Sequence, residues 1–400
     1  MAAKQFTPEE WKKIRKTFDG ADAPEKFGLP KRVYGSVVLG SFNIRKLGSS
    51  RSRNEDTWKF LADTCMHFDL LAVQEILDDL SGLRRLKSLL GPDFGLVISD
   101  TTGAFPGRRG LAERLGFIYN RRLVERTEIA TDITYDRTEV FKTLALNRDR
   151  IRPVVNRYGK YLESVQAWEN GRKVDPKPKA PTKRQLRMPV FLTFIRQPFC
   201  VGFRIHGYPG TDPYEFMAVN AHLNYGDPKH DPIQEFHALM NWLVARSGQK
   251  GKTYHPNFIL LGDLNMDYDK PVVDKERLTQ DIKGLNTITQ KGVRVNFPFF
   301  DIHPDRSEVF RTNARESETY DQIGLFSRDN RLPTYEMNET KMGKKPTGPD
   351  YGVFNLTELF ATALGVPDSQ RQDLIKRFEH KVSDHMPLWL RLPLPERSST

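Results

Sequence analysis

The chain has 400 residues, of which 38% are hydrophobic and 25 are Phe, so it can build a sizeable core and is too rich in aromatics for a disordered chain. No run of roughly 18 or more apolar residues occurs, which argues against a membrane-spanning helix. The net charge of +11 favours polyanionic partners, with nucleic acid first and anionic membranes or phosphorylated small molecules second.

The cysteines and the first residues bear on where the protein works. Cys65 lies in a helical pattern and Cys200 in a strand-like run, so we expect two buried free thiols and no disulfide framework. The opening residues have neither the apolar core nor the small-residue cleavage site of a signal peptide. These features predict an intracellular, cytoplasmic protein.

Residues 1–30 are predicted to form an accessory helical extension. Thr7, Pro8 and Glu10 give a capping box with proline at the first helical position, which begins a basic helix that runs to about Phe18. Residues 20–30 are interpreted as a linker to the main domain, which is expected to cover residues 31–396.

Short apolar runs separated by turn signals follow from residue 36 onward. We interpret as strands residues 36–44, 70–76, 96–99, 115–120, 190–196, 200–205, 216–223, 258–264, 320–326 and 388–392. A second capping box at Ser52 and Glu55 begins a helix with Trp58 and Phe68 on its apolar face, and residues 232–246 form another helix. Many strands with helices between them predict a layered α/β or α+β domain.

Residues 132–187 do not follow that pattern and are interpreted as an insertion. Helix-like stretches come first, and residues 171–187 then carry seven Lys or Arg against one Asp, together with three prolines. This segment is predicted to be an exposed basic loop. It serves either as a solvated linker or as a clamp on a phosphate backbone, since Lys and Arg provide most sequence-independent affinity for nucleic acid.

Five segments of the predicted sheets end in, or begin after, polar residues that can bind a metal or carry a proton. These residues are Asn43, Glu75, His222, the pair Asp263 and Asn265, and the pair Asp384 and His385. A carboxylate at the end of a buried strand is costly unless it is paired, hydrogen-bonded or bound to a metal. Five such positions therefore indicate one shared polar site.

The oxygen ligands of this site suit Mg²⁺, with Mn²⁺ or Ca²⁺ as alternatives. A zinc site is not indicated, because neither Cys65 nor Cys200 has the spacing of a ligand pair. Residues 263–269 imitate the start of an EF-hand loop, but Tyr268 stands where that loop needs glycine and a strand precedes the segment. We therefore reject an EF-hand.

All of these polar residues except His222, together with Asp321, belong to five motifs in a fixed order: Ser41-Phe42-Asn43, Gln74-Glu75, Gly262-Asp263-Leu264-Asn265, Tyr320-Asp321 and Ser383-Asp384-His385. This ordered set resembles the motifs of the endonuclease/exonuclease/phosphatase superfamily. Residues 194–198 and 112–117 are similar to two further segments of the deoxyribonuclease I-like nucleases. The resemblance implies a four-layer sandwich, in which two mostly antiparallel β-sheets pack face to face and are covered by helices.

The resemblance also implies which residues hold the metal and the attacking water. Glu75 and Asn43 would bind the metal, and Asp384 would be a second ligand or an orienting group. Asp263 and Asn265 would orient or deprotonate the water, and Asn265 would also contact the substrate phosphate.

Proton transfer and phosphate binding are assigned by the same resemblance. His222 and His385 would stand on either side of the scissile phosphate as general acid and phosphate ligand. Glu113 would orient His222, and Asp321 would orient His385. Arg196 would neutralise phosphate charge.

We therefore expect a Mg²⁺-dependent phosphodiesterase, an endonuclease that hydrolyses DNA with little sequence specificity. An RNA-cleaving enzyme, a sphingomyelinase or a phosphatase of the same superfamily stays open, because one scaffold hosts several substrates. A catalytically silent nucleic-acid-binding module is the alternative from another class. The retained proton-transfer residues argue against it.

Overall fold

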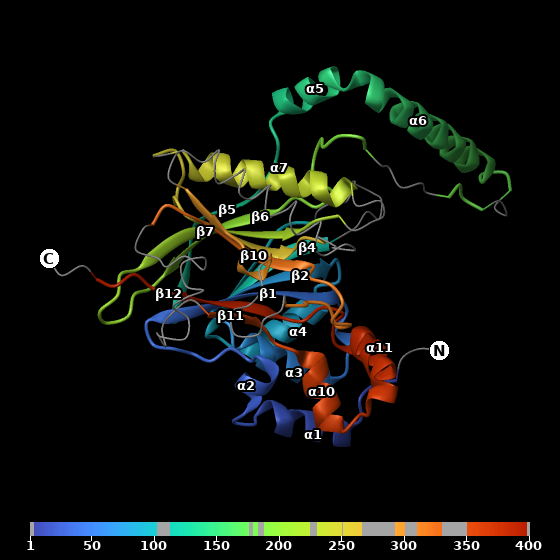
Figure 1. The fold of residues 1–400 in the computed structure, drawn as a ribbon. Helices are drawn as coiled ribbons and strands as arrows, with labels where there is room; N and C mark the ends of the chain where they lie inside the picture. The colour runs from blue at the N-terminus through green and yellow to red at the C-terminus, as the bar shows by residue number, and fades with distance from the viewer. Residues whose placement is uncertain are drawn as a thin grey trace.

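Two six-stranded β-sheets pack face to face in the computed structural model of the chain, and helices cover both outer faces (Figure 1). The structure describes residues 4–101, 113–175, 179–182, 188–224, 230–249, 251–265, 293–300, 310–329 and 350–397. Each sheet has one parallel pair at its centre and antiparallel pairs on either side. The expected fold class, a sandwich of two mostly antiparallel sheets covered by helices, is confirmed.

The first sheet has the strand order β11-β12-β1-β2-β4-β3. Its strands are β1 (Ser36–Leu47), β2 (Leu70–Leu77), β3 (Phe94–Ile98), β4 (Glu113–Asn120), β11 (Asp350–Val353) and β12 (Leu388–Pro393). The parallel pair is β1 and β2, and helix α3 (Glu55–Cys65) makes the crossover connection that a parallel pair needs.

The second sheet has the strand order β5-β6-β7-β8-β10-β9. Its strands are β5 (Val124–Asp132), β6 (Phe199–Ile205), β7 (Tyr214–His222), β8 (Phe258–Asp263), β9 (Arg294–Asn296) and β10 (Asp321–Ser327). Here β7 and β8 are the parallel pair, and α7 (His230–Ser247) lies in the connection between them.

Three apolar layers hold the sandwich together. In β1, Val37 and Leu39 face the second sheet, whereas Val38 and Phe42 face the helices on the outside of the first sheet. A third layer lies between the second sheet and α7, which covers that sheet in Figure 1. The central strands are buried on both faces, which explains why they appear in the sequence as continuous apolar runs and not as alternating ones.

The outer face of the first sheet carries most of the remaining helices (Figure 1). These are α1 (Pro8–Phe18), α2 (Ala23–Phe27), α4 (Ser81–Leu90), α10 (Leu356–Leu364) and α11 (Arg371–Lys381). Three single 3₁₀ turns occur in the described chain at Ser50–Ser52, Pro298–Phe300 and Asp368–Gln370.

The N-terminal capping box is confirmed: the Thr7 side chain accepts from the Glu10 backbone N–H, and the Glu10 carboxylate accepts from the Thr7 N–H at 2.7 Å. Helix α1 packs onto the main domain through Trp11, which is 1% exposed. The linker interpretation is wrong for residues 23–27, because they form α2 and bury Phe27 in the same core.

Two other local predictions are also wrong. The cap of α3 is Asn54, whose side chain accepts from the Thr57 N–H, so Glu55 opens the helix and no box with Ser52 forms. Residues 190–196 form no strand. Phe194 is instead buried in the layer beneath α7, and β5, whose side chains are mostly polar or partly exposed, occupies the sheet edge.

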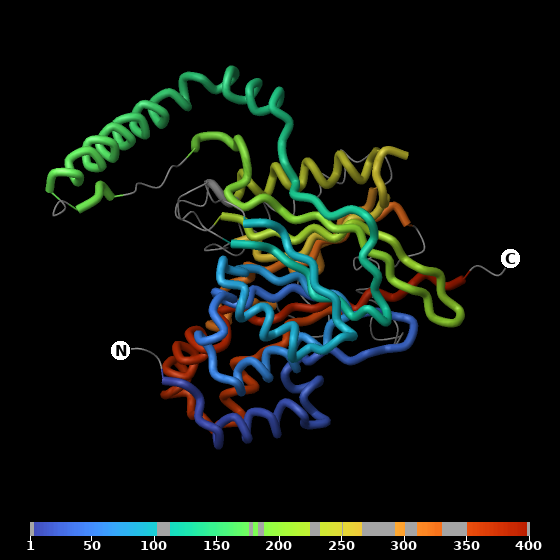
Figure 2. The backbone as a smooth tube through the Cα atoms, turned by 180° about the vertical axis from the view of Figure 1, so that it is seen from behind, coloured from blue at the N-terminus to red at the C-terminus, as the bar shows by residue number. Residues whose placement is uncertain are grey.

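The insertion forms α5 (Arg137–Leu146) and α6 (Arg148–Gly171), which project from the body of the domain (Figures 1 and 2). Within the predicted basic loop, residues 176–178 and 183–187 lie outside the described residues, as does Ala112 at the start of the segment 112–117. No helix in the described ranges is both long and apolar enough to cross a membrane.

The two cysteines are buried and free, as expected. Burial raises the pKa of both the Cys65 and the Cys200 thiol to about 12. Neither thiol is therefore a candidate nucleophile.

Candidate active site

The strand ladders bring the motif residues together at the ends of the two parallel pairs. In the second sheet, Asp263 lies opposite His222 on one side and opposite Asp321 on the other. In the first sheet, the Asn43 Nδ2 donates to Glu75 Oε1 at 3.1 Å. The same Nδ2 donates to Asp263 Oδ2 at 3.1 Å, so the two halves of the site meet across the sandwich.

Asp263 is at the centre of the site and is 1% exposed. Its Oδ2 lies 3.5 Å from Nε2 of His222 and 3.5 Å from Nε2 of His385. Its Oδ1 accepts from the Asn265 backbone N–H at 3.0 Å. One buried carboxylate therefore faces two imidazoles, and an adjacent amide side chain comes from the turn that follows β8.

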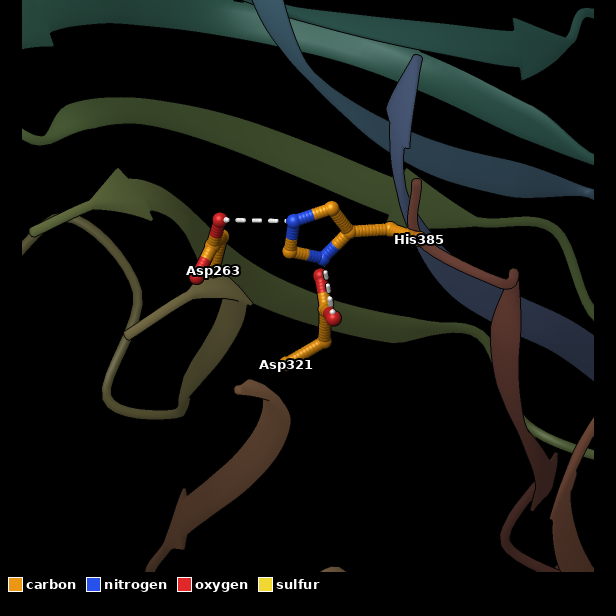
Figure 3. A group of neighbouring side chains, drawn as sticks. All are labelled: Asp263, Asp321 and His385. Carbon is orange, nitrogen blue, oxygen red and sulfur yellow. Dashed lines mark hydrogen bonds and ion pairs between the residues drawn. The ribbon is translucent and has the colours of Figure 1, made fainter. Parts of the chain in front are cut away.

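A second carboxylate contacts the other ring nitrogen of each histidine. Glu113 Oε2 lies 3.1 Å from Nδ1 of His222, and Asp321 Oδ2 lies 2.8 Å from Nδ1 of His385. Figure 3 shows the His385 ring between Asp263 and Asp321. Each imidazole is thus fixed through Nδ1 and presents Nε2 to the same point, an arrangement that determines both ring orientation and tautomer.

The charges of this cluster stabilise one another. Burial opposes ionisation of Asp263, but the charges of His385 and His222 outweigh it and hold the pKa of that carboxyl below its usual value. Burial likewise opposes the charged form of His385, yet the carboxylates of Asp321 and Asp263 raise the pKa of its imidazole well above the usual value. These contacts therefore favour the charged forms of both Asp263 and His385.

The two remaining carboxylates near the histidines differ in their surroundings. Burial opposes ionisation of Glu113, but hydrogen bonding to His222 and the charge of Arg196 keep its pKa below the usual value. Burial raises the pKa of Asp321, which is 0% exposed and whose charge is compensated mainly by His385. Both carboxylates depend on a cationic partner, as buried charges must.

Unusual backbone conformations occur at three of these positions. Glu75 has φ 58° and Asn265 has φ 49°, in the left-handed region that only a few per cent of non-glycine residues adopt. At Gly262 a Cβ atom would lie 1.9 Å from the Ala221 carbonyl oxygen, so the residue before Asp263 has to be glycine. Strain of this kind persists only where the surrounding structure enforces it. Here the strained backbone orients the side chains of Glu75 and Asn265 in the site.

Two of the three predicted metal ligands have a side-chain oxygen without a hydrogen bond in the described residues. Oδ1 of Asn43 is buried and makes no hydrogen bond within the described chain, and the same holds for Oδ1 of Asp384. Glu75 is partly buried and accepts from the Lys46 N–H through Oε2 at 2.8 Å. Burial raises the pKa of Asp384, and the nearby charge of Glu75 adds to that rise. These donors fit a hard divalent cation.

Asp263, Asp321 and His385 form a second group of possible ligands. Their ligand atoms all lie within 4.8 Å of one another, and all three residues are buried. In this group the Nδ1 of His385 is already bonded to Asp321, so its Nε2, which faces Asp263, is the ring nitrogen left for a metal. The described chain thus offers a buried Asp/Asp/His group beside the oxygen donors of Asn43 and Glu75.

Arg196 lies behind His222, at 8% exposure. Its Nε is 2.6 Å from Glu113 Oε2, and one terminal nitrogen donates to the Leu223 carbonyl at 3.2 Å. These contacts make Arg196 a support for Glu113. Its expected contact with substrate phosphate stays a prediction.

Sequence reasoning missed two residues that position the site. Asn220 donates through Nδ2 to the Val73 carbonyl at 3.0 Å and to the Gly116 carbonyl at 2.8 Å, which ties the second sheet to the first. Ser383 donates through Oγ to the Asn43 carbonyl at 2.6 Å and holds the loop before β12. For Asn220 the signal was a polar residue at an inward position of an apolar strand.

Comparison with known proteins gives distant relatives. No protein-family model matches the chain. The chain is 31% identical over 98 residues to Deoxyribonuclease-1 of Gallus gallus, covering 24% of this chain and 35% of that protein. It is 23% identical over 245 residues to a Deoxyribonuclease of Thioalkalivibrio sp., covering 60% and 48% respectively. The chain therefore spans less than half the length of either relative.

Both of these curated relatives are deoxyribonucleases. The expected resemblance to deoxyribonuclease I-like nucleases is confirmed. Similar solved structures include an endonuclease/exonuclease/phosphatase family protein of Bacteroides thetaiotaomicron, with 13% identity and a TM-score of 0.45 over 89% of this chain and 94% of that one. Another is a mannosyl-6-phosphatase of the same organism, with 14% identity and a TM-score of 0.44 over 89% and 99%.

Proposed function

We propose that the chain is a metal-dependent phosphodiesterase, an endonuclease that hydrolyses DNA with little sequence specificity. The observation that carries this proposal is the position of Asp263 between two imidazoles, each fixed by its own carboxylate. Hydrolysis of a phosphodiester needs a base near the attacking water, an acid near the leaving oxygen and positive charge around the phosphate. We assign the base to Asp263, and the acid and positive charge to the two imidazoles together with the bound metal.

Asp263 is the group placed to take a proton from water. Its pKa is held below the usual value, and its two oxygens are fixed by hydrogen bonds from the Asn43 side chain and the Asn265 backbone N–H. His222 and His385 face this carboxylate through Nε2. In the proposed reaction one imidazole donates a proton to the leaving oxygen, and the other donates a hydrogen bond to a non-bridging oxygen of the phosphate.

Asn43, Glu75 and Asp384 would hold the metal, Mg²⁺ or alternatively Mn²⁺ or Ca²⁺, which when bound supplies positive charge to the phosphate. Glu113 and Asp321 keep the two rings oriented through their Nδ1 atoms. Arg196 adds positive charge next to Glu113. The choice of DNA is supported by the two deoxyribonuclease relatives and by the net charge of +11.

One panel of substrates tests the proposal. The purified chain is incubated with supercoiled plasmid, single-stranded DNA, RNA, sphingomyelin vesicles and a phosphomonoester, with Mg²⁺ or with EDTA. We expect Mg²⁺-dependent nicking of the plasmid. Cleavage of RNA alone, of sphingomyelin or of the monoester would assign one of the alternative activities, and binding without any cleavage would indicate a silent module.

A single substitution tests the proposed mechanism. His222→Ala is expected to slow plasmid nicking by about 10²- to 10⁴-fold, the usual contribution of a positioned acid or base. His206→Ala is the matched control, because His206 follows β6 outside the motifs, and it should nick at the wild-type rate. Near-wild-type nicking by His222→Ala would remove His222 from the mechanism.

A further inference from the structure

The helical arm, defined as residues 137–175 with α5 and α6, carries much of the positive charge of the chain. These residues include nine Lys or Arg against five Asp or Glu, and residues 176–187 add five Lys or Arg with no acidic residue. Together residues 137–187 account for +9 of the net charge of +11. The rest of the chain is close to neutral, so the excess positive charge is concentrated in one segment of the chain.

The arm is covered by little else in the described chain. None of the ten residues of α5 is buried, although half of them are apolar. In α6 the basic side chains are exposed, among them Arg148, Arg152, Arg157 and Lys160. The residues Phe141 and Tyr158 are 63% and 40% exposed. Helix α5 contacts α6 but buries none of its residues, and a helix of ten residues is marginal in water on its own, so this surface is suited to being covered by a ligand.

The base of the arm adjoins the candidate active site. The chain leaves β5 and returns to β6 as a pair of adjacent segments, where the Ile133 N–H donates to the Pro198 carbonyl at 2.8 Å. The returning segment carries Arg196, whose guanidinium contacts Glu113. Glu235 of α7 accepts from the Ile195 N–H at 2.8 Å and fixes this segment. A long ligand bound at the site therefore has the arm beside it.

We propose that the helical arm binds the phosphate backbone of the nucleic acid substrate on one side of the cleaved bond. This inference rests on the proposed function. The 24 residues of α6 span about 36 Å, close to one turn of B-form DNA at about 34 Å, whereas a small phosphoester would not reach past the base of the arm. Arginine and lysine supply the backbone contacts, and the exposed rings of Phe141 and Tyr158 offer stacking surfaces for unpaired bases.

An anionic bilayer is the competing ligand. The arm also exposes the aliphatic side chains of Leu146, Val155 and Leu162. A bilayer could bury these side chains while its anionic headgroups bind the same basic residues. The attachment of the arm to the Arg196 segment favours the substrate of the site over a bilayer. The experiment has to separate these two ligands.

The test measures binding without cleavage. Fluorescence anisotropy of a labelled DNA duplex of 30 base pairs is recorded in EDTA over a range of NaCl concentrations, for the full chain and for a variant that combines Arg148→Gln, Arg152→Gln, Arg157→Gln and Lys160→Gln. Each phosphate contact contributes about 0.9 to the slope of log K against log salt. We expect the slope to fall by about 2 to 4 and the affinity at about 0.1 M salt to fall about tenfold or more.

A matched control removes the same number of charges from the opposite side of the sandwich, by combining Lys12→Gln, Lys13→Gln, Lys16→Gln and Lys26→Gln. These lysines lie on α1 and α2, which cover the outer face of the first sheet, far from the arm in Figures 1 and 2. The control should bind DNA with the wild-type slope. Equal slopes for the arm variant and the control would overturn the proposal.

Two further readouts keep the outcomes distinct. The arm variant should hydrolyse bis(p-nitrophenyl) phosphate like the wild type, because its four substitutions do not touch Asp263. Binding to phosphatidylserine vesicles that is lost in the arm variant, with DNA binding unchanged, would assign the arm to lipid and overturn the proposal. A wild-type chain that binds DNA through the arm and cleaves no phosphodiester would refute the proposed function alone.

Discussion

Replacing Asn220 with alanine tests how the second sheet holds the strand end that carries Glu75. The register of β2 against β4 shifts after Val73, and the carbonyls of Val73 and Gly116 at that point accept hydrogen bonds from Nδ2 of Asn220. Oδ1 of Asn220 accepts from Gln74 Nε2 at 2.7 Å. Glu75 follows directly with φ 58°, so this irregular backbone turns its carboxylate into the site.

The size of the effect follows from these three hydrogen bonds. Asn220→Ala leaves two carbonyls and one amide N–H without their partner, and Asn220 and Gln74 are both 0% exposed, so bulk water does not replace it. A buried polar group that loses its partner costs about 1–3 kcal/mol. We expect the free energy of unfolding to fall by about 3–5 kcal/mol, a large part of the about 5–15 kcal/mol typical of a domain.

Urea unfolding followed by tryptophan fluorescence measures this loss, with an unchanged m-value as the sign that only stability has changed. Asn170→Ala, at an exposed position in α6, is the matched control and should stay within about 0.5 kcal/mol of wild type. Plasmid nicking at a temperature where both variants are folded should also slow, because Glu75 is displaced. A stability loss under about 1 kcal/mol together with unchanged nicking would refute the reasoning.

Two other predictions concern the site and the N-terminal helix. Asp321→Asn removes the carboxylate that orients His385 and should slow plasmid nicking by about 10²- to 10⁴-fold. Asp368→Asn, at an exposed position, is the control and should nick at the wild-type rate. Comparable rates for both variants would contradict the role assigned to Asp321. Arg377 lowers the pKa of the Glu10 carboxyl to about 2, so this pair stabilises the fold above about pH 4.5 and loses its effect as the pH falls toward 2. After allowance for solvent screening, Glu10→Gln should cost about 1 kcal/mol at pH 7 and less at pH 3 in urea unfolding, and a cost that does not change with pH would contradict the ion pair.

The sequence determined the parts of this structure that depend on neighbouring residues. The capping box at Thr7 and the apolar runs of β1, β2, β7 and β8 were predictable, because capping and strand formation are local. Local patterns gave a wrong prediction where tertiary contacts determine the conformation. Residues 190–196 are apolar enough for a strand, but they form none, and Phe194 is buried beneath α7. The short or polar edge strands β5, β9 and β11 gave too weak a pattern to be predicted.

For the site, the sequence determined which side chains stand at the ends of buried strands, because polar residues such as Asp263 interrupt apolar runs. Only the tertiary structure decided that Asp263 lies between His222 and His385, since those contacts need one parallel pair, one antiparallel pair and a loop before β12 to meet. It also decided that Asn220 ties the two sheets together beneath them. The physical reason is that helix capping and the apolar pattern of a strand are set by neighbouring residues, whereas the pairing of strands and the packing of one sheet on another depend on residues far apart in the chain.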